Sequence, residues 1–165
     1  MPKIIKNFEV VEDDWTLVET ADWDAVHGLP GGPVIVPATL WLSHSADLNH
    51  EAADVGIWLN SDEHPEIIRD HIQAMTLIAI NFPDFNDGRG YSYARILREQ
   101  FGYAGELRAI GDVLQDQLQF MYRCGFDSFA VRADKDPHVA LTGLTDFRNA
   151  YQPATRNIGS ALVYR

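Results

Sequence analysis

The sequence predicts an α/β domain: a mainly parallel sheet of about five strands with crossover helices, plus an N-terminal β-hairpin. From residue 33 onwards, short apolar runs alternate with segments of helical period, and glycines and prolines separate them. A β-α-β-α-β order implies parallel strands joined by right-handed crossovers. It leaves two arrangements open, an open doubly wound sheet and a partial TIM-barrel-like sheet, because both give the same alternation.

The length of 165 residues indicates one domain. We expect residues 1–32 to form the hairpin and a loop, residues 33–152 the α/β core, and residues 153–165 a C-terminal tail. In the first part, Phe8 to Glu19 alternate apolar and polar residues around Glu12-Asp13-Asp14, which predicts the hairpin. The turn formers in residues 28–33 predict a loop. Val34 opens an apolar run in which Pro37 marks an edge strand or a bend.

The predicted core elements follow in order along the chain. Pro65 suits the first turn of a helix, and Gly125 suits the position just after the end of one. Ligands of such sheets bind beyond the carboxyl ends of the strands, so the polar loops at residues 85–90 and 111–112 are the predicted site. The predicted strands are Val55 to Leu59, Leu77 to Phe82, Leu107 to Ile110 and Ser128 to Val131, and the predicted helices are Pro65 to Ala74, Tyr91 to Phe101 and Asp112 to Cys124.

Composition excludes several classes of function. The 24 acidic and 13 basic residues give a net charge of -11, which disfavours nucleic acid and anionic membranes as partners. The single cysteine excludes an intrachain disulfide and any site that needs several thiolates. His64 and His71 could share a helix face but lack a third ligand, so no metal site is expected. No signal-peptide run or apolar stretch of about 20 residues is present, and we expect a cytoplasmic protein.

The first candidate constellation surrounds a glycine-rich turn before a predicted helix. Gly88 and Gly90 would let backbone N–H groups approach a ligand, and Arg89 could bind sulfate, sulfite, phosphate or a carboxylate. A purely structural interpretation is also open, in which Ser92 caps the helix and Arg89 pairs with Asp87. The spacing matches neither a dinucleotide fingerprint nor a P-loop. The candidate ligand-binding residues here are Asp87, Arg89, Tyr91, Ser92 and Arg95.

The second constellation is a helix face that carries Asp112, Asp116, Gln119 and Arg123, at offsets of four, seven and eleven. Asp112 and Asp116 could form a carboxylate pair for acid–base chemistry, or Asp112 could simply cap the helix. We count Asp112, Asp116 and Arg123 as candidate ligand-binding residues.

Arg108 is a further candidate because it stands inside a short apolar strand. A buried arginine must be paired, and Asp87, Asp112 and Asp127 are the partners that the sequence suggests. Pairing within the chain and ligand binding are both open for this residue.

Three stretches resemble a bacterial family of unknown function whose members are labelled as oxidoreductases involved in sulfite reduction. The similarity is close from Phe82 to Phe129, and a weaker echo follows at Phe147 to Gln152. The stretches are Phe85-x-Asp87-Gly88-Arg89-Gly90-Tyr91-Ser92-x-Ala94-Arg95-x-Leu97-Arg98, Gly102-Tyr103-x-Gly105-Glu106-Leu107-Arg108-Ala109-x-Gly111-Asp112-Val113-Leu114-x-Asp116-Gln117, and Arg123-x-Gly125-Phe126-Asp127.

The resemblance implies a role in assimilatory sulfite reduction and cysteine biosynthesis, because family members tend to be encoded beside sulfite reductase genes. It favours an accessory protein that acts with sulfite reductase, its electron donor or another sulfur-assimilation protein. The alternative is an enzyme that binds a small oxyanion or a nucleotide, including a flavin-dependent oxidoreductase. No cofactor motif is identifiable, although a flavin could bind without one. The sequence assigns no catalytic residue and leaves a homo-oligomer open.

Overall fold

The computed structural model describes residues 2–26, 31–51 and 54–145, and its centre is one eight-stranded sheet. The strand order is β2-β1-β8-β7-β6-β5-β4-β3. The strands β3 to β8 are parallel and follow chain order, whereas β1 pairs antiparallel with both β2 and β8. The strands are β1 (Lys3–Lys6), β2 (Glu9–Glu12), β3 (Thr16–Leu17), β4 (Val34–Pro37), β5 (Val55–Leu59), β6 (Leu77–Phe82), β7 (Glu106–Gly111) and β8 (Ser128–Phe129).

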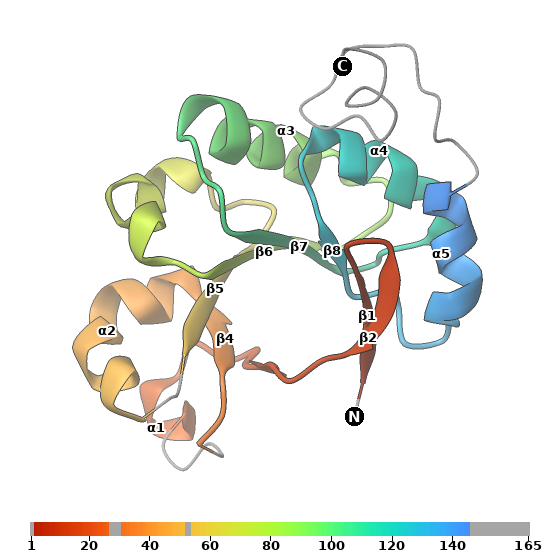
Figure 1. The fold of residues 1–165 in the computed structure, drawn as a ribbon. Coiled ribbons are helices and arrows are strands. Elements are labelled where there is room, and N and C mark those ends of the chain that lie inside the picture. Colours follow the sequence, from red (N-terminus) through yellow and green to blue (C-terminus); the bar gives the residue numbers. More distant parts are fainter. Residues whose placement is uncertain (1, 27–30, 52–53, 146–165) are drawn as a thin grey trace.

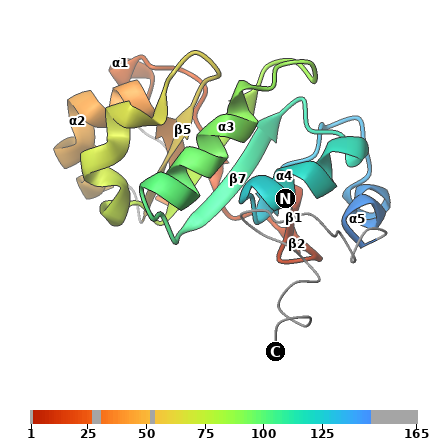
Figure 2. The same cartoon turned by 90° about the horizontal axis from the view of Figure 1, so that it is seen from above.

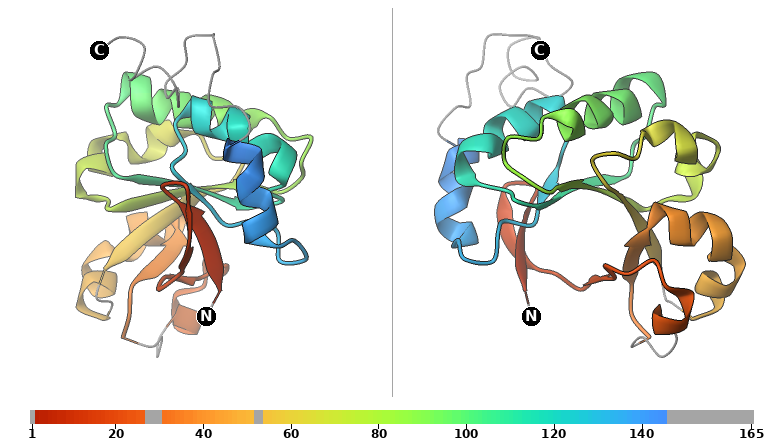
Figure 3. Two further views of the ribbon diagram at one scale, coloured as in Figure 1. Left: turned by 45° about the vertical axis from the view of Figure 1, so that its right-hand side comes forward. Right: turned by 180° about the vertical axis from the view of Figure 1, so that it is seen from behind.

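The sheet curves into a half-barrel with helices along its convex face (Figure 1). One crossover connection follows each of the strands β4 to β7, and Figure 3 shows these connections covering the outside of the curve. The connections are α2 (Ala38–Glu51), the 3₁₀ helix η1 (Pro65–Ala74), α3 (Arg89–Arg95) with the π-helix η2 (Ile96–Gln100), and the 3₁₀ helix η3 (Gln115–Gln117) with α4 (Leu118–Cys124). Two further helices are α1 (Trp23–Val26) and α5 (Pro137–Thr145).

The predicted fold class is therefore wrong. The sheet has eight strands rather than about five, and it is mixed rather than built on a doubly wound parallel arrangement. A doubly wound sheet reverses its strand order at a switch point and carries helices on both faces. Here the parallel strands are added in chain order from β3 to β8, which keeps the crossovers on one face and bends the sheet.

The main core lies between the convex face and the helices. Strand residues on that face, such as Ile57, Ile80 and Leu107, have no exposed surface and pack with helix residues such as Ile68 and Leu97. Burying an apolar side chain of this size contributes about 1.5–3 kcal/mol, and this layer holds more buried apolar residues than the concave face.

The concave face carries a second, smaller apolar cluster formed by Ile35, Leu77, Ala79 and Ile110. Residues 13–18 cross over this face from β2 to β3, and Trp15 of this strap packs against the cluster. Figure 3 shows the strap spanning the open side of the curved sheet. The indole N–H of Trp58 on β5 donates to the carbonyl of Val18 at 2.8 Å and ties the far end of the strap down.

Several predicted boundaries are confirmed, and others are wrong. The strands β5 and β6 and the helix Pro65–Ala74 have the predicted bounds, although that helix is 3₁₀. The hairpin turns at Asn7 and Phe8, both with positive φ (51° and 67°), and not at residues 12–14.

Helix boundaries near the C-terminal part of the described chain also differ from the prediction. The predicted helix from Asp112 begins only at Gln115, because Gly111 has a φ of +91° and Asp112 continues as loop. Helix α5 has no counterpart in the prediction. The predicted tail, residues 153–165, lies outside the described residues.

Candidate functional site

The carboxyl ends of β5 to β8 form one polar edge of the half-barrel. In Figure 2 the arrowhead of β7 points to the same side of the molecule as the loop that leads into α3. Alternation along β6 turns Asn81 toward the concave side, and Asn60, Asp112 and Arg132 lie in the loops that follow β5, β7 and β8. The amide of Asn81 donates to the side-chain oxygen of Asn60 at 3.0 Å, and Arg132 pairs with Asp112 at 2.9 Å.

Arg89 and Asp87 form a close ion pair in the loop between β6 and α3. The guanidinium donates to both carboxylate oxygens of Asp87, at 2.7 and 3.0 Å, and to the hydroxyl of Ser61 at 3.0 Å. The hydrogen bonds from the Arg89 side chain and backbone hold the pKa of Asp87 well below its usual range. The ion pair of the purely structural interpretation is thus present in this loop, although the Arg89 side chain is still 56% exposed.

Asp112 joins three loops rather than capping a helix, which corrects the second predicted constellation. One carboxylate oxygen accepts from the backbone N–H of Phe85 at 2.9 Å, and the other binds Arg132. Arg132 also pairs with Asp134 at 2.6 Å, and its hydrogen bonds to Asp134 and Asp112 raise its pKa. Because Asp112 precedes η3, it does not share a helix face with Asp116 or Arg123.

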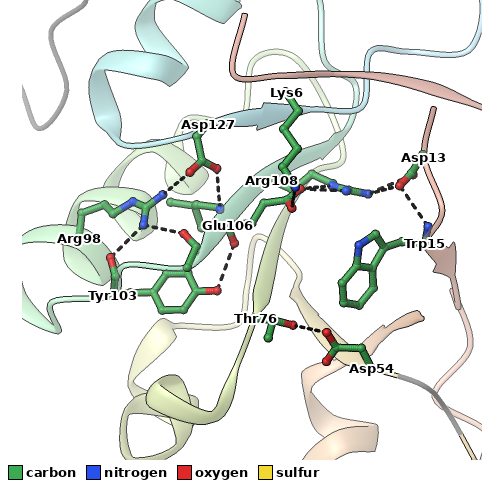
Figure 4. A network of polar contacts seen from close by, with 12 residues as sticks. Lys6, Asp13, Trp15, Asp54, Thr76, Arg98, Tyr103, Glu106, Arg108 and Asp127 are labelled. Atoms are coloured by element: carbon green, nitrogen blue, oxygen red, sulfur yellow. Dashed lines mark hydrogen bonds and ion pairs between the residues drawn. The ribbon is translucent and has the colours of Figure 1, made fainter. Parts of the chain in front are cut away.

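Arg108 lies on the concave face and is paired within the chain (Figure 4). Its side chain is only 2% exposed, and it binds both carboxylate oxygens of Asp13 at 3.0 Å and one oxygen of Glu106 at 2.8 and 3.1 Å. Lys6 completes the group with a 2.6 Å bond to Glu106. The predicted partners Asp87, Asp112 and Asp127 are wrong, because the strap brings an aspartate from 95 residues earlier in the chain.

The opposite edge of the sheet, at the amino ends of β7 and β8, holds a second network (Figure 4). Arg98 donates to the carbonyls of Tyr103, Gly105 and Gly125 at 2.8–2.9 Å and to Asp127 at 3.2 Å. Burial raises the pKa of the Tyr103 phenol. These contacts fix the geometry of the loops at this edge. Asp127, which precedes β8, therefore lies at the opposite edge of the sheet from Asp87, which follows β6.

The remaining predicted residues are scattered. Tyr91 is half-buried with its ring 5.2 Å from Phe82 and 4.9 Å from Phe120, measured between centroids. Ser92 is exposed and does not cap α3, whose N-cap is Gly88. Arg95 is 3.7 Å from Glu99 on the same helical stretch, Arg123 lies in the last turn of α4, and Asp116 is exposed on η3.

Four residues of the strand-end edge were missed by the sequence prediction: Asn60, Ser61, Asn81 and Arg132. The available signal was strand alternation, since a polar residue at the end of an apolar strand faces the loops that carry ligands.

Phe85 stands out because its backbone is held on both sides while its side chain is in solvent. Its N–H donates to Asp112, and its carbonyl accepts from the side-chain amide of Gln117 at 2.9 Å. The Phe85 side chain is 52% exposed, and Phe120 on α4 is 47% exposed. The edge therefore presents aromatic surface on a fixed backbone.

Within the described residues, no three or more His, Cys, Asp and Glu side chains are grouped so as to hold a metal ion. No described helix has the length and apolar character needed to cross a membrane.

The fold and this edge define an α/β half-barrel protein with polar loops at the carboxyl ends of β5 to β8. The chain belongs to the family described as bacterial protein of unknown function (DUF934), whose model matches residues 56–161. The resemblance predicted from the sequence is thus confirmed, and the match leaves β1 to β4 outside it. No curated protein matches the chain.

Proposed function

We propose that this protein is an accessory protein of assimilatory sulfite reduction and cysteine biosynthesis, which docks on sulfite reductase or its electron donor. The observation that carries the docking role is Phe85, an exposed aromatic residue on a backbone fixed by Asp112 and Gln117. Aromatic residues dominate binding energy in protein interfaces, and a preformed loop loses little entropy on binding. The sulfur context comes from the family label and gene neighbourhood that the resemblance implies.

The arginines of the predicted oxyanion site favour this role over ligand binding. Arg89 is occupied by Asp87 and Ser61, and Arg108 by Asp13 and Glu106. An oxyanion would have to displace a carboxylate of the chain at either position, which opposes binding.

Co-purification with the sulfite reductase of the same bacterium tests the proposal. We expect micromolar binding that Phe85→Ala weakens about tenfold or more, because a buried interface aromatic contributes about 1–2 kcal/mol or more. Ile67→Ala is the matched control, since Ile67 is 42% exposed and lies on η1, in a different crossover connection from Phe85.

A strain that lacks the gene supplies the second measurement. We expect poor growth on sulfate or sulfite and normal growth on cysteine. No binding at micromolar concentration, together with normal growth of the deletion strain on sulfite, would overturn the proposal.

The second candidate function is an enzyme that binds a small oxyanion or nucleotide, and the exposed guanidinium of Arg89 beside Gly88 and Ser61 favours it. Calorimetry with sulfite, sulfate and adenylylsulfate tests it, and Arg89→Ala should abolish any binding. A flavin-dependent version requires that the purified protein be yellow or take up flavin mononucleotide.

A further inference from the structure

A pocket of about 260 Å³ opens between η3 and the start of α5. Its walls combine apolar and acidic side chains, with Val139 57% exposed at the surface. Such a site suits a long side chain that has an aliphatic stem and a polar end. The residues that line the pocket are Leu114, Gln115, Asp116, Lys135, Asp136, Val139 and Ala140.

The two walls of the pocket are held together before anything binds. The side-chain amide of Gln115 donates to the hydroxyl of Thr142 at 2.9 Å. Gly143 approaches so closely that a Cβ there would lie 2.6 Å from the carbonyl oxygen of Gln115. The pocket is therefore preformed, which lowers the entropy cost of binding.

The charged residues of the lining are Asp116, Asp136 and Lys135, so its net charge is negative. Asp116 is exposed and makes no hydrogen bond or ion pair with any residue in the described part of the chain. One oxygen of Asp136 accepts from the backbone N–H of His138 at 2.9 Å. Lys135 also lines the pocket, and its ammonium lies 4.0 Å from Asp134, a carboxylate that is not part of the lining.

The short helix η3 links the pocket to Phe85 through neighbouring residues. Within this single turn, Asp116 lines the pocket and Gln117 holds the carbonyl of Phe85. We therefore expect a partner that covers Phe85 to reach the pocket as well.

The loops around the pocket and Phe85 are also acidic. Residues 60–64, 83–89, 111–117 and 130–136 contain eight acidic residues against Arg89, Arg132 and Lys135. Both arginines are already paired with carboxylates. Complementary potential steers association, so an acidic edge selects a basic partner.

Building on the proposed docking role, we propose that the partner presents a basic surface and inserts a lysine or arginine side chain into the pocket between η3 and α5 while it covers Phe85. The stem lies along Val139 and Leu114, and the cationic end faces Asp116 and Asp136. The pocket thus selects the partner by charge, and Phe85 anchors it.

Nα-acetylarginine amide probes the pocket without any assumption about the partner. Its addition to the full-length ¹⁵N-labelled protein should shift the amide resonances of residues 114–116, 136 and 138–140 in a saturable way. Nα-acetylcitrulline amide, a neutral molecule of the same shape, should not. Asp116→Asn should weaken the binding of the arginine probe by about threefold to fivefold, whereas Asp70→Asn, an equal charge change at an exposed residue of η1, should leave it unchanged.

Equal shifts with the citrulline probe, or shifts spread evenly over the acidic surface, would overturn the pocket assignment. Binding to sulfite reductase separates the two proposals. Asp116→Lys should reduce that affinity at least about threefold more than Asp70→Lys, and the affinity should fall with added salt. Reductase binding that is insensitive to Asp116 would refute the pocket proposal and leave the docking role standing. An arginine-specific pocket without any reductase binding would refute the docking role and leave the pocket standing.

Discussion

Replacing Arg108 by methionine tests whether the strap is locked to the concave face by a buried ion-pair network. Arg108 is 2% exposed, and its partners Asp13 and Glu106 have side chains that are 12% and 10% exposed. Methionine fills a similar volume, but it leaves Glu106 with Lys6 alone and removes the guanidinium that binds Asp13. Removing one partner from a buried pair costs about 3–5 kcal/mol, and domains have a free energy of unfolding of only about 5–15 kcal/mol.

Urea unfolding followed by circular dichroism and tryptophan fluorescence measures this loss. The matched control is Arg69→Met, because Arg69 is 58% exposed and pairs only with Glu66 at 3.1 Å on the same helix; its loss should stay below about 0.5 kcal/mol. Adding Asp13→Asn to Arg108→Met should recover part of the stability, since it removes one orphaned charge. A loss below about 1 kcal/mol for Arg108→Met, or one equal to that of the control, would refute the reasoning.

Three further predictions follow from single positions. Gly111→Ala should lower the free energy of unfolding by more than about 1 kcal/mol, because φ is +91° and the new Cβ would lie 2.4 Å from the carbonyl oxygen of Phe82; Gly88→Ala, whose nearest contact would be 3.9 Å, should be nearly neutral in the same urea assay. Burial raises the pKa of the Cys124 thiol, so Ellman's reagent should label it slowly in the native protein and rapidly in urea; rapid native labelling would contradict this. Burial alone would raise the pKa of Glu106, but the nearby cations Arg108 and Lys6 lower it below its ordinary value of 4.5. The stability that ionised Glu106 contributes should therefore be complete above about pH 4.5 and be lost as the pH falls further. Glu106→Gln should make the free energy of unfolding less dependent on pH between about pH 3 and 6.

The individual core strands could be predicted because their signal is local. Short apolar runs ended by a proline or a glycine placed β5 and β6 at their observed bounds. The strand count and sheet type could not be predicted, because β3 has only two residues and β1 joins through antiparallel pairing with β8, 122 residues later in the chain. These pairings depend on which strand edges meet in the folded sheet, and the periodicity of apolar residues along the chain does not predict which edges meet.

The candidate site was predicted in part. The loops after β6 and β7 do lie together at the strand ends, as the parallel order requires, and Asp87 pairs with Arg89 there. The prediction placed Asp112 at the start of a helix because aspartate is a common helix cap. In the structure Gly111 has a positive φ, and the helix begins only at Gln115. Alternation along β6 and β7 puts Asn81 at the edge and buries Arg108 in the concave face.

The sequence by itself determined the α/β alternation, the family, the acidic charge and the strand ends at which polar loops gather. Each of these depends on residue type and on neighbours within a few positions. Only the tertiary structure decided that Asp87 and Asp127 lie at opposite edges of the half-barrel, and that Asp13 neutralises Arg108. Sheet closure and ion pairing join residues far apart in the chain, so their geometry follows from the packing of the whole sheet rather than from any local pattern.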